Sequence, residues 1–319
     1  MDDSAPIPVW FVIARAVHFA ACMVLLGICL FDRFVAPREQ GGERDAWRQI
    51  FLVLLAIALP AAAVSGVAWL VYVTMDMSEL SYSQAMQGGT ISIVLNQTHF
   101  GTLWQLRGLL FLGAGICGVL LLFSRQARRR IFPLLVWLTL VFAAPFSMSL
   151  AWAGHGQIGS WPGLHLADDC AHLAVVSFWP TGLLPFLLMM FRLRRDPSPA
   201  AWTIMAAMTR RFSAISLTSV ILLAITGLAN GFFIFRQACD IYMTAYGRVL
   251  CLKVGLFCAM IVFGAVNLLV LKPGIALPAT QEKSARQLRR NCLVELILAT
   301  AIILAVAVLG RLPPGMMMG

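Results

Sequence analysis

The sequence predicts an all-α membrane protein with about eight transmembrane helices. Hydrophobic residues make up 60% of the chain and charged residues only 12%, and that charged content is about half that of an average soluble domain. Apolar stretches of about 20 residues, which are long enough to cross a hydrocarbon core of about 30 Å, recur along the whole chain. Arginine and lysine gather in every second connection between these stretches.

Eight apolar stretches are predicted to be the transmembrane helices, because each is long enough to span the hydrocarbon core. They cover residues 9–31, 49–74, 100–123, 131–153, 168–191, 212–235, 247–271 and 290–311. The second and seventh are long enough to tilt. The N-terminus, Met1-Asp2-Asp3, lacks the basic region of a cleavable signal peptide, so we expect the first stretch to remain as a helix.

The basic residues predict the topology. The first, third, fifth and seventh connections are rich in arginine and lysine, whereas the second and fourth have neither and the sixth has only Arg236. Cytoplasmic loops of membrane proteins carry such an excess, so both termini are predicted to be periplasmic. The same loops account for the formal charge of +10. The expected surroundings are therefore a lipid bilayer, and no nucleic-acid partner is expected.

The two halves of the chain resemble each other, which predicts a parallel repeat of four plus four helices. The predicted halves are residues 1–153 and 154–319. Four helices per half preserve the orientation, so the repeat axis would run along the membrane normal, and sites are expected where repeats meet. The matching positions are His18 and His172, Ser65-Gly66 and Thr226-Gly227, Phe100-Gly101 and Tyr246-Gly247, and Arg107 and Lys253.

All five histidines fall at the predicted periplasmic surface or in the outer half of the membrane. Histidine is the commonest protein metal ligand, so this one-sided cluster predicts a metal or haem site. His155, His165 and His172 bracket one tight loop and form the strongest local cluster. His99, at the start of the third span, fits a purely interfacial residue best.

Further candidate residues lie near these histidines. Asp168 is one turn before His172, where it would bind a metal, orient the imidazole or cap the helix. His18 lies about 13 Å into the first span, where a polar ring marks a functional site or a histidine bonded to a neighbouring helix. Cys22 is one turn deeper, and Glu295 lies near the inner end of the last span. Cys22 and Glu295 are therefore candidates for a translocation path.

Four cations, Arg15, Arg107, Arg248 and Lys253, lie in the outer halves of the predicted spans. They would repel a metal cation, whereas they would suit haem propionates. Snorkelling to the interface explains Arg248 and partly explains Arg107. An alternative hypothesis is therefore a b-type cytochrome in which His18 and His172 are the axial ligands of haem b, since helix bundles build such sites from facing helices.

The order of several motifs resembles the copper resistance protein D family (CopD/PcoD). These motifs are Ala153-Gly154-His155, Asp168, Ala171-His172-Leu173-Ala174, Trp179, Gly182-Leu183-Leu184-Pro185, Thr226-Gly227-Leu228, Tyr246-Gly247-Arg248-Val249-Leu250, Lys253, Asn267, Glu295 and Leu312-Pro313-Pro314. The resemblance implies a multi-pass protein of the bacterial inner membrane that handles copper with a periplasmic CopC-type partner. His155 and His172 match the family pattern. The chain departs from it at Trp179-Pro180-Thr181-Gly182, where Pro180 is predicted to kink the fifth span.

The predicted function is copper ion transport or homeostasis, giving copper resistance or uptake, and not catalysis. His155, His165 and His172, with Asp168, would capture copper at the periplasmic face. His18 and Cys22 would accept the ion deeper in the membrane, because imidazole and thiolate suit copper. No ATP-binding motif is visible, so movement would be passive or coupled to another gradient.

Overall fold

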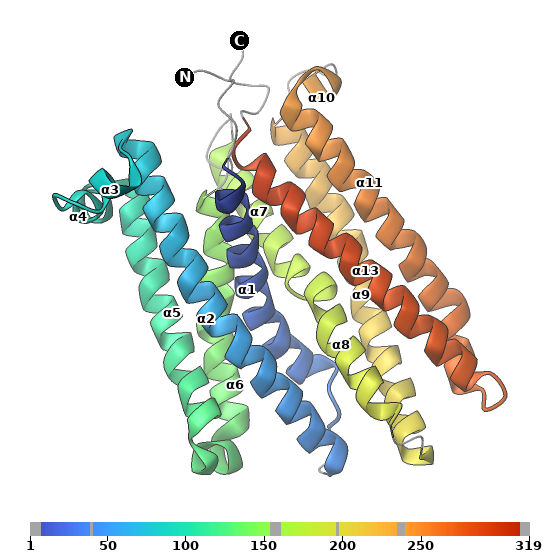
Figure 1. Ribbon diagram of the computed structural model, residues 1–319. Helices are drawn as coiled ribbons and strands as arrows, with labels where there is room; N and C mark the ends of the chain where they lie inside the picture. The colour runs from blue at the N-terminus through green and yellow to red at the C-terminus, as the bar shows by residue number, and fades with distance from the viewer. Residues whose placement is uncertain (1–7, 39–40, 154–160, 196–197, 235–239, 313–319) are drawn as a thin grey trace.

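The computed structural model is a bundle of long helices (Figure 1) and describes residues 8–38, 41–153, 161–195, 198–234 and 240–312. Eight helical segments in these ranges are long and apolar enough to cross a membrane. None of the described residues forms a strand. The predicted all-α membrane fold with eight spans is therefore confirmed.

The first half of the chain, residues 1–153, supplies four of the spanning segments. Two short helices, α3 and α4, fill the connection between α2 and α5. Thr98 caps α5, since its side chain accepts a hydrogen bond from the Gly101 amide. The helices are α1 (Val9–Phe34), α2 (Gly42–Ser78), α3 (Tyr82–Ala85), α4 (Thr90–Gln97), α5 (His99–Phe123), α6 (Arg125–Met148) and the 3₁₀ turn η1 (Ser149–Ala153).

The second half, residues 154–319, supplies the other four spanning segments, of which the fifth and seventh are composite. Thr244 caps α11 through the Gly247 amide, just as Thr98 caps α5. The helices are α7 (Pro162–Val176), α8 (Trp179–Leu193), α9 (Pro199–Ile234), α10 (Asp240–Met243), α11 (Ala245–Val266), the π-helical η2 (Asn267–Leu271), α12 (Lys272–Ala276) and α13 (Gln281–Leu309).

The fifth span is broken between α7 and α8. Ser177 and Phe178 separate the two helices, and Pro180 lies in the first turn of α8. Proline has no amide hydrogen to donate to the preceding turn, so a helix is interrupted there and proline is tolerated only in the first turn. The predicted disturbance at Pro180 is therefore present as a full break in the helix.

The predicted start of the fifth span at residue 168 was wrong. Helix α7 begins at Pro162, which takes the first-turn position that proline favours. His165 consequently lies inside a helix and is buried, rather than in the preceding loop. For the same reason Asp168 is in the middle of α7, so the alternative that it caps the helix was also wrong.

Helix α1 lies in the middle of the bundle, where it contacts α2 and α6 of the first half and α8 and α13 of the second (Figure 1). It lies close to the start of α8 at Gly27. A Cβ atom at this position would lie only 2.6 Å from Thr181 Oγ1 and 2.7 Å from the Ser177 carbonyl oxygen. The break in the fifth span therefore packs directly against the backbone of α1.

Charged side chains join helices at both ends of the bundle. At the end where α1 begins and α13 ends, here called the terminal end, Arg311 makes two hydrogen bonds of 2.9 and 3.1 Å to Asp76. At the opposite end, here called the basic end, the buried Asp32 accepts bonds from Arg33, Arg44 and Trp47. These contacts join α2 to α13 and α1 to α2.

Replacing Gly27 by alanine is expected to destabilise the protein by about 1–3 kcal/mol, because the added methyl group overlaps the α7–α8 break. The matched control is Gly115→Ala in α5, where no other atom lies within 4 Å of the new carbon. Thermal unfolding in detergent, followed by circular dichroism, measures the difference. Equal melting temperatures for the two variants would contradict this packing.

Candidate functional site

His18 and His172 are held by the same kind of hydrogen bond. His18 Nδ1 lies 3.1 Å from both the Ala62 carbonyl oxygen and Ser65 Oγ. His172 Nδ1 lies 2.8 Å from Thr226 Oγ1, which gives its own proton to the Leu222 carbonyl at 2.8 Å. Since these oxygens accept, Nδ1 donates in both residues. Each neutral imidazole therefore presents its lone pair at Nε2.

The Nε2 atom of His18 is blocked by Arg107. The guanidinium Nη2 lies 2.7 Å from Nε2 and 3.8 Å from Cys22 Sγ, and Nη1 donates to Ser149 Oγ at 2.5 Å. The Arg107 side chain is 2% exposed and stacks over the rings of Trp104 and Phe146, whose π faces stabilise its charge. Snorkelling therefore does not explain Arg107.

The contact of Arg107 with His18 is relevant to two hypotheses from the sequence, that His18 binds haem and that His18 and Cys22 bind copper. Both ring nitrogens of His18 are engaged, so ligation of haem by His18 would require the Arg107 contact to break. The same holds for copper at His18 and Cys22, because Arg107 lies between their ligand atoms. The geometry fits the alternative that His18 is a histidine bonded to neighbouring helices.

His172 instead faces a cavity of about 200 Å³, here called the histidine cavity. Helices α7, α9, α11 and α13 of the second half form most of its wall, and α1 and η1 of the first half complete it. Among the described residues, no hydrogen bond reaches His172 Nε2. The polar and charged residues that line the histidine cavity are Arg15, His165, Asp169, His172, Asn230, Tyr246 and Lys253.

His165 lines the same cavity and is oriented by a chain of side chains. Asn230 Nδ2 donates to Asp168 Oδ2 at 2.8 Å, and Asn230 Oδ1 lies 2.9 Å from His165 Nε2. A carboxylate only accepts, so the amide orientation is fixed and His165 Nε2 must be the donor. Its lone pair is then at Nδ1, which is buried and has no partner in the described part of the chain.

Asp168 has a hydrogen-bond partner that was not predicted, and its role as a metal ligand stays a prediction. It was expected to bind a metal or to orient His172, whereas it holds Asn230, which in turn holds His165. Hydrogen-bonded partners of this kind fix the tautomer and the direction of a histidine. The sequence reasoning also missed Asn230 as a contact of His165, because the two lie on different helices.

Asp169 is the carboxylate that lines the histidine cavity. It lies four residues after His165 and three before His172, so all three share one face of α7. This spacing was visible in the sequence, but Asp168 was predicted to be the carboxylate that binds a metal or orients His172. Asp169 interacts electrostatically with the half-buried Lys253, which also faces His172. The carboxylate therefore offsets the charge of Lys253.

His165 and His172 are two helical turns apart, which is about 10 Å along the axis. No group of three His, Cys, Asp or Glu residues in the described ranges is close enough to hold one metal ion. The predicted ligand His155 lies outside the described residues. His99 is exposed at the start of α5, which fits the interfacial position expected for it. The cavity thus offers separate donor atoms along its length.

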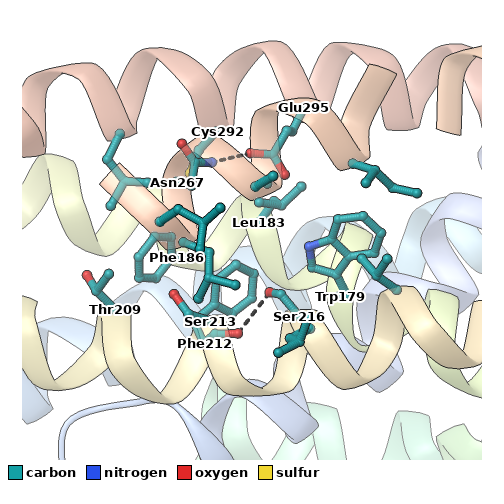
Figure 2. A pocket seen from close by; sticks show the side chains of 18 residues that line it. Trp179, Leu183, Phe186, Thr209, Phe212, Ser213, Ser216, Asn267, Cys292 and Glu295 are labelled. Atoms are coloured by element: carbon teal, nitrogen blue, oxygen red, sulfur yellow. Dashed lines mark hydrogen bonds between the residues drawn. The ribbon is translucent and has the colours of Figure 1, made fainter. Parts of the chain in front are cut away.

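A second cavity, of about 160 Å³ and here called the glutamate cavity, lies further along α13 toward the basic end (Figure 2). Val176 lines the histidine cavity and Trp179 lines the glutamate cavity, so the break in the fifth span falls between them. Polar groups in its wall are Thr209, Ser213, Ser216, Asn267, Cys292 and Glu295.

Glu295 is 1% exposed and accepts a hydrogen bond of 2.5 Å from Asn267 Nδ2 (Figure 2). The sequence left snorkelling to the membrane surface as an alternative for this residue. That alternative was wrong, because the carboxyl group is enclosed between α8, α9, η2 and α13. The two cavities place titratable side chains along one side of α13, inside the second half of the bundle.

The fold and these cavities define a multi-pass membrane protein with metal-ligand side chains inside its helix bundle. Residues 1–163 match the model of the copper resistance protein D-like N-terminal domain, and residues 206–309 match that of copper resistance protein D. The chain therefore belongs to the copper resistance protein D family, as the motifs suggested. The second match includes Thr226, Asn230, Lys253 and Glu295.

Two relatives are similar over nearly the whole chain. Copper resistance protein D of Pseudomonas syringae pv. tomato is 26% identical over 337 aligned residues that cover 100% of both proteins. Copper transport protein CutJ of Bacillus subtilis (strain 168) is 28% identical over 310 residues, which cover 94% of this chain. The chain spans only about half of the length of the latter, 52%. No solved structure matches the chain.

Arg107→Lys is expected to destabilise the protein by about 1.5–3 kcal/mol, because one ammonium group cannot reach His18, Ser149 and the Phe146 carbonyl together. The substitution keeps the charge, so loss of the forked hydrogen bonds is what changes. The control is Arg248→Lys at an exposed position of α11. Thermal unfolding in detergent should show a lower midpoint for Arg107→Lys only, and equal midpoints would contradict the blocking contact.

Proposed function

We propose that this protein moves copper ions across the membrane through the second half of its bundle. Membership of the copper resistance protein D family establishes a function related to copper. The observation that carries the proposal is the difference between two similar histidines. His172 lines a cavity and no described residue makes a hydrogen bond to its Nε2, whereas Arg107 covers Nε2 of His18.

The histidine cavity is the proposed entry site. The unpaired Nδ1 of His165 and the Nε2 of His172 are neutral nitrogen donors, which suit copper. Their separation of about two turns favours transfer from one donor to the next over tight chelation. Asp169 between them carries a negative charge that partly offsets the two cations of the lining, Arg15 and Lys253, which would otherwise repel a copper ion.

The path would continue past Trp179 into the glutamate cavity. Discontinuous membrane helices mark substrate sites and moving parts in many transporters, and the break at Ser177 and Phe178 lies between the two cavities. The roles of His18 and Cys22 as deeper copper acceptors are not retained in this path, because Arg107 occupies both.

Copper is proposed to enter from the periplasm and to be delivered by a periplasmic protein. The excess of arginine and lysine in the connections at the basic end supports a cytoplasmic location for that end. The histidine cavity would then open toward the periplasm, where His155 would add a further ligand. A periplasmic copper-binding protein of the CopC type is the proposed donor, and copper itself is the transported substrate.

Thr226→Val should weaken copper binding by about 10–100-fold, because it removes the acceptor that fixes the tautomer of His172. Ser65→Ala makes the same kind of change next to His18 and should leave copper affinity unchanged. Equilibrium titration against a competing copper chelator in detergent measures both. An equal loss in Ser65→Ala would place copper in the first half and contradict the proposal.

The double variant His165→Ala/His172→Ala should abolish copper flux into proteoliposomes, because both proposed nitrogen donors are lost. His99→Ala, an exposed histidine outside both cavities, serves as the control and should keep wild-type flux. Thermal unfolding of each variant checks that the bundle is intact. Wild-type flux in a folded double variant would refute this route.

A further inference from the structure

Glu295 is a buried carboxyl group without a cationic partner. Its side chain is 1% exposed, and none of the ion pairs among the described residues includes it. Burying an unpaired carboxylate in a membrane protein costs several kcal/mol, so the protonated acid is the favoured form. Ionisable residues in this situation commonly serve as relays for protons or ions.

Three amide side chains form a directed chain toward Glu295. Gln287 Nε2 donates to Asn291 Oδ1 at 2.9 Å, Asn291 Nδ2 donates to Asn267 Oδ1 at 2.8 Å, and Asn267 Nδ2 donates to Glu295 Oε1. Because Oε1 accepts, an acid proton is placed on Oε2. Gln287 is exposed toward the basic end, so this polar strip extends about 12 Å along α13 from Gln287 to Glu295.

The wall of the glutamate cavity provides acceptors (Figure 2). The hydroxyl groups of Thr209 and Ser216 donate to carbonyl groups of their own helix at 2.8 Å, so their lone pairs remain available. Cys292 is the only other titratable residue in the lining, and α8, α9, α11 and η2 contribute no charged side chain to it. Asn267 begins the π-helical segment, and such segments are frequent at functional sites.

We propose that Glu295 is a proton-binding site that releases its proton when a copper ion enters the glutamate cavity and takes one up when the ion leaves. The inference rests on the proposed copper path. An approaching cation favours the carboxylate, and the O–H bond at Oε2 then breaks to give a carboxylate and one proton, which passes to bulk water. Copper prefers nitrogen and sulfur donors to a lone carboxylate, so Glu295 binds a proton and does not coordinate the copper ion. Copper movement would thereby be coupled to a proton gradient.

Infrared spectroscopy of the purified protein tests the protonation directly and needs no copper. The difference between the wild type and Glu295→Gln should contain the carbonyl band of a protonated carboxylic acid at neutral pH, and that band should disappear at high pH. The control Glu282→Gln changes an exposed carboxylate on the same helix and should lack this band. Absence of the acid band from the Glu295 difference spectrum would overturn the proposal.

Coupling is tested in proteoliposomes that contain a pH-sensitive dye. Copper uptake by the wild type should be accompanied by a proton signal. In Glu295→Gln the proton signal should be lost, and Glu295→Asp should recover it. A proton signal that persists in Glu295→Gln, or wild-type uptake without any signal, would overturn the proposal. If the wild type takes up no copper, the proposed transport function fails, and the infrared result still decides whether Glu295 holds a proton.

Discussion

Inside a bilayer every polar group needs a partner within the protein, and two imidazoles meet this requirement alike at Nδ1 but differently at Nε2. Hydroxyl groups of Ser65 and Thr226 accept from the Nδ1 atoms of His18 and His172. The other nitrogen of His18 accepts from Arg107, whereas that of His172 faces a cavity. A fixed arginine thus bonds Nε2 of His18, whereas Lys253 faces His172 and no described residue makes a hydrogen bond to its Nε2.

The open histidine belongs to a larger arrangement along α13. The histidine cavity and the glutamate cavity follow one another, and the fifth span is broken where they approach. The break is fixed against the backbone of α1 at Gly27. Asp169 offsets the charge of Lys253 in the first cavity, while Glu295 in the second is in none of the ion pairs of the described part of the chain. The two cavities therefore differ in charge and in the ligands that suit them.

Hydropathy and the positions of the basic residues predicted the eight helices, because the bilayer imposes both patterns on the sequence. The correspondence of His18 with His172 and of Ser65 with Thr226 was also visible in the sequence. The two histidines make matching hydrogen bonds, His18 to Ser65 and His172 to Thr226. The contact of Arg107 with His18 was not predictable, since it depends on how α1 and α5 are rotated. The shared face of His165, Asp169 and His172 was missed because the start of α7 was placed six residues too late, which left His165 in a loop.

The central claim is that copper binds in the second half, at His165 and His172, and not at His18 and Cys22. Anomalous diffraction at the copper edge, measured on crystals of the full chain soaked with copper, tests this most directly. The account predicts a copper peak in the histidine cavity beside His165 or His172, with Arg107 still bonded to His18. A peak beside His18 and Cys22, with Arg107 displaced, would contradict it.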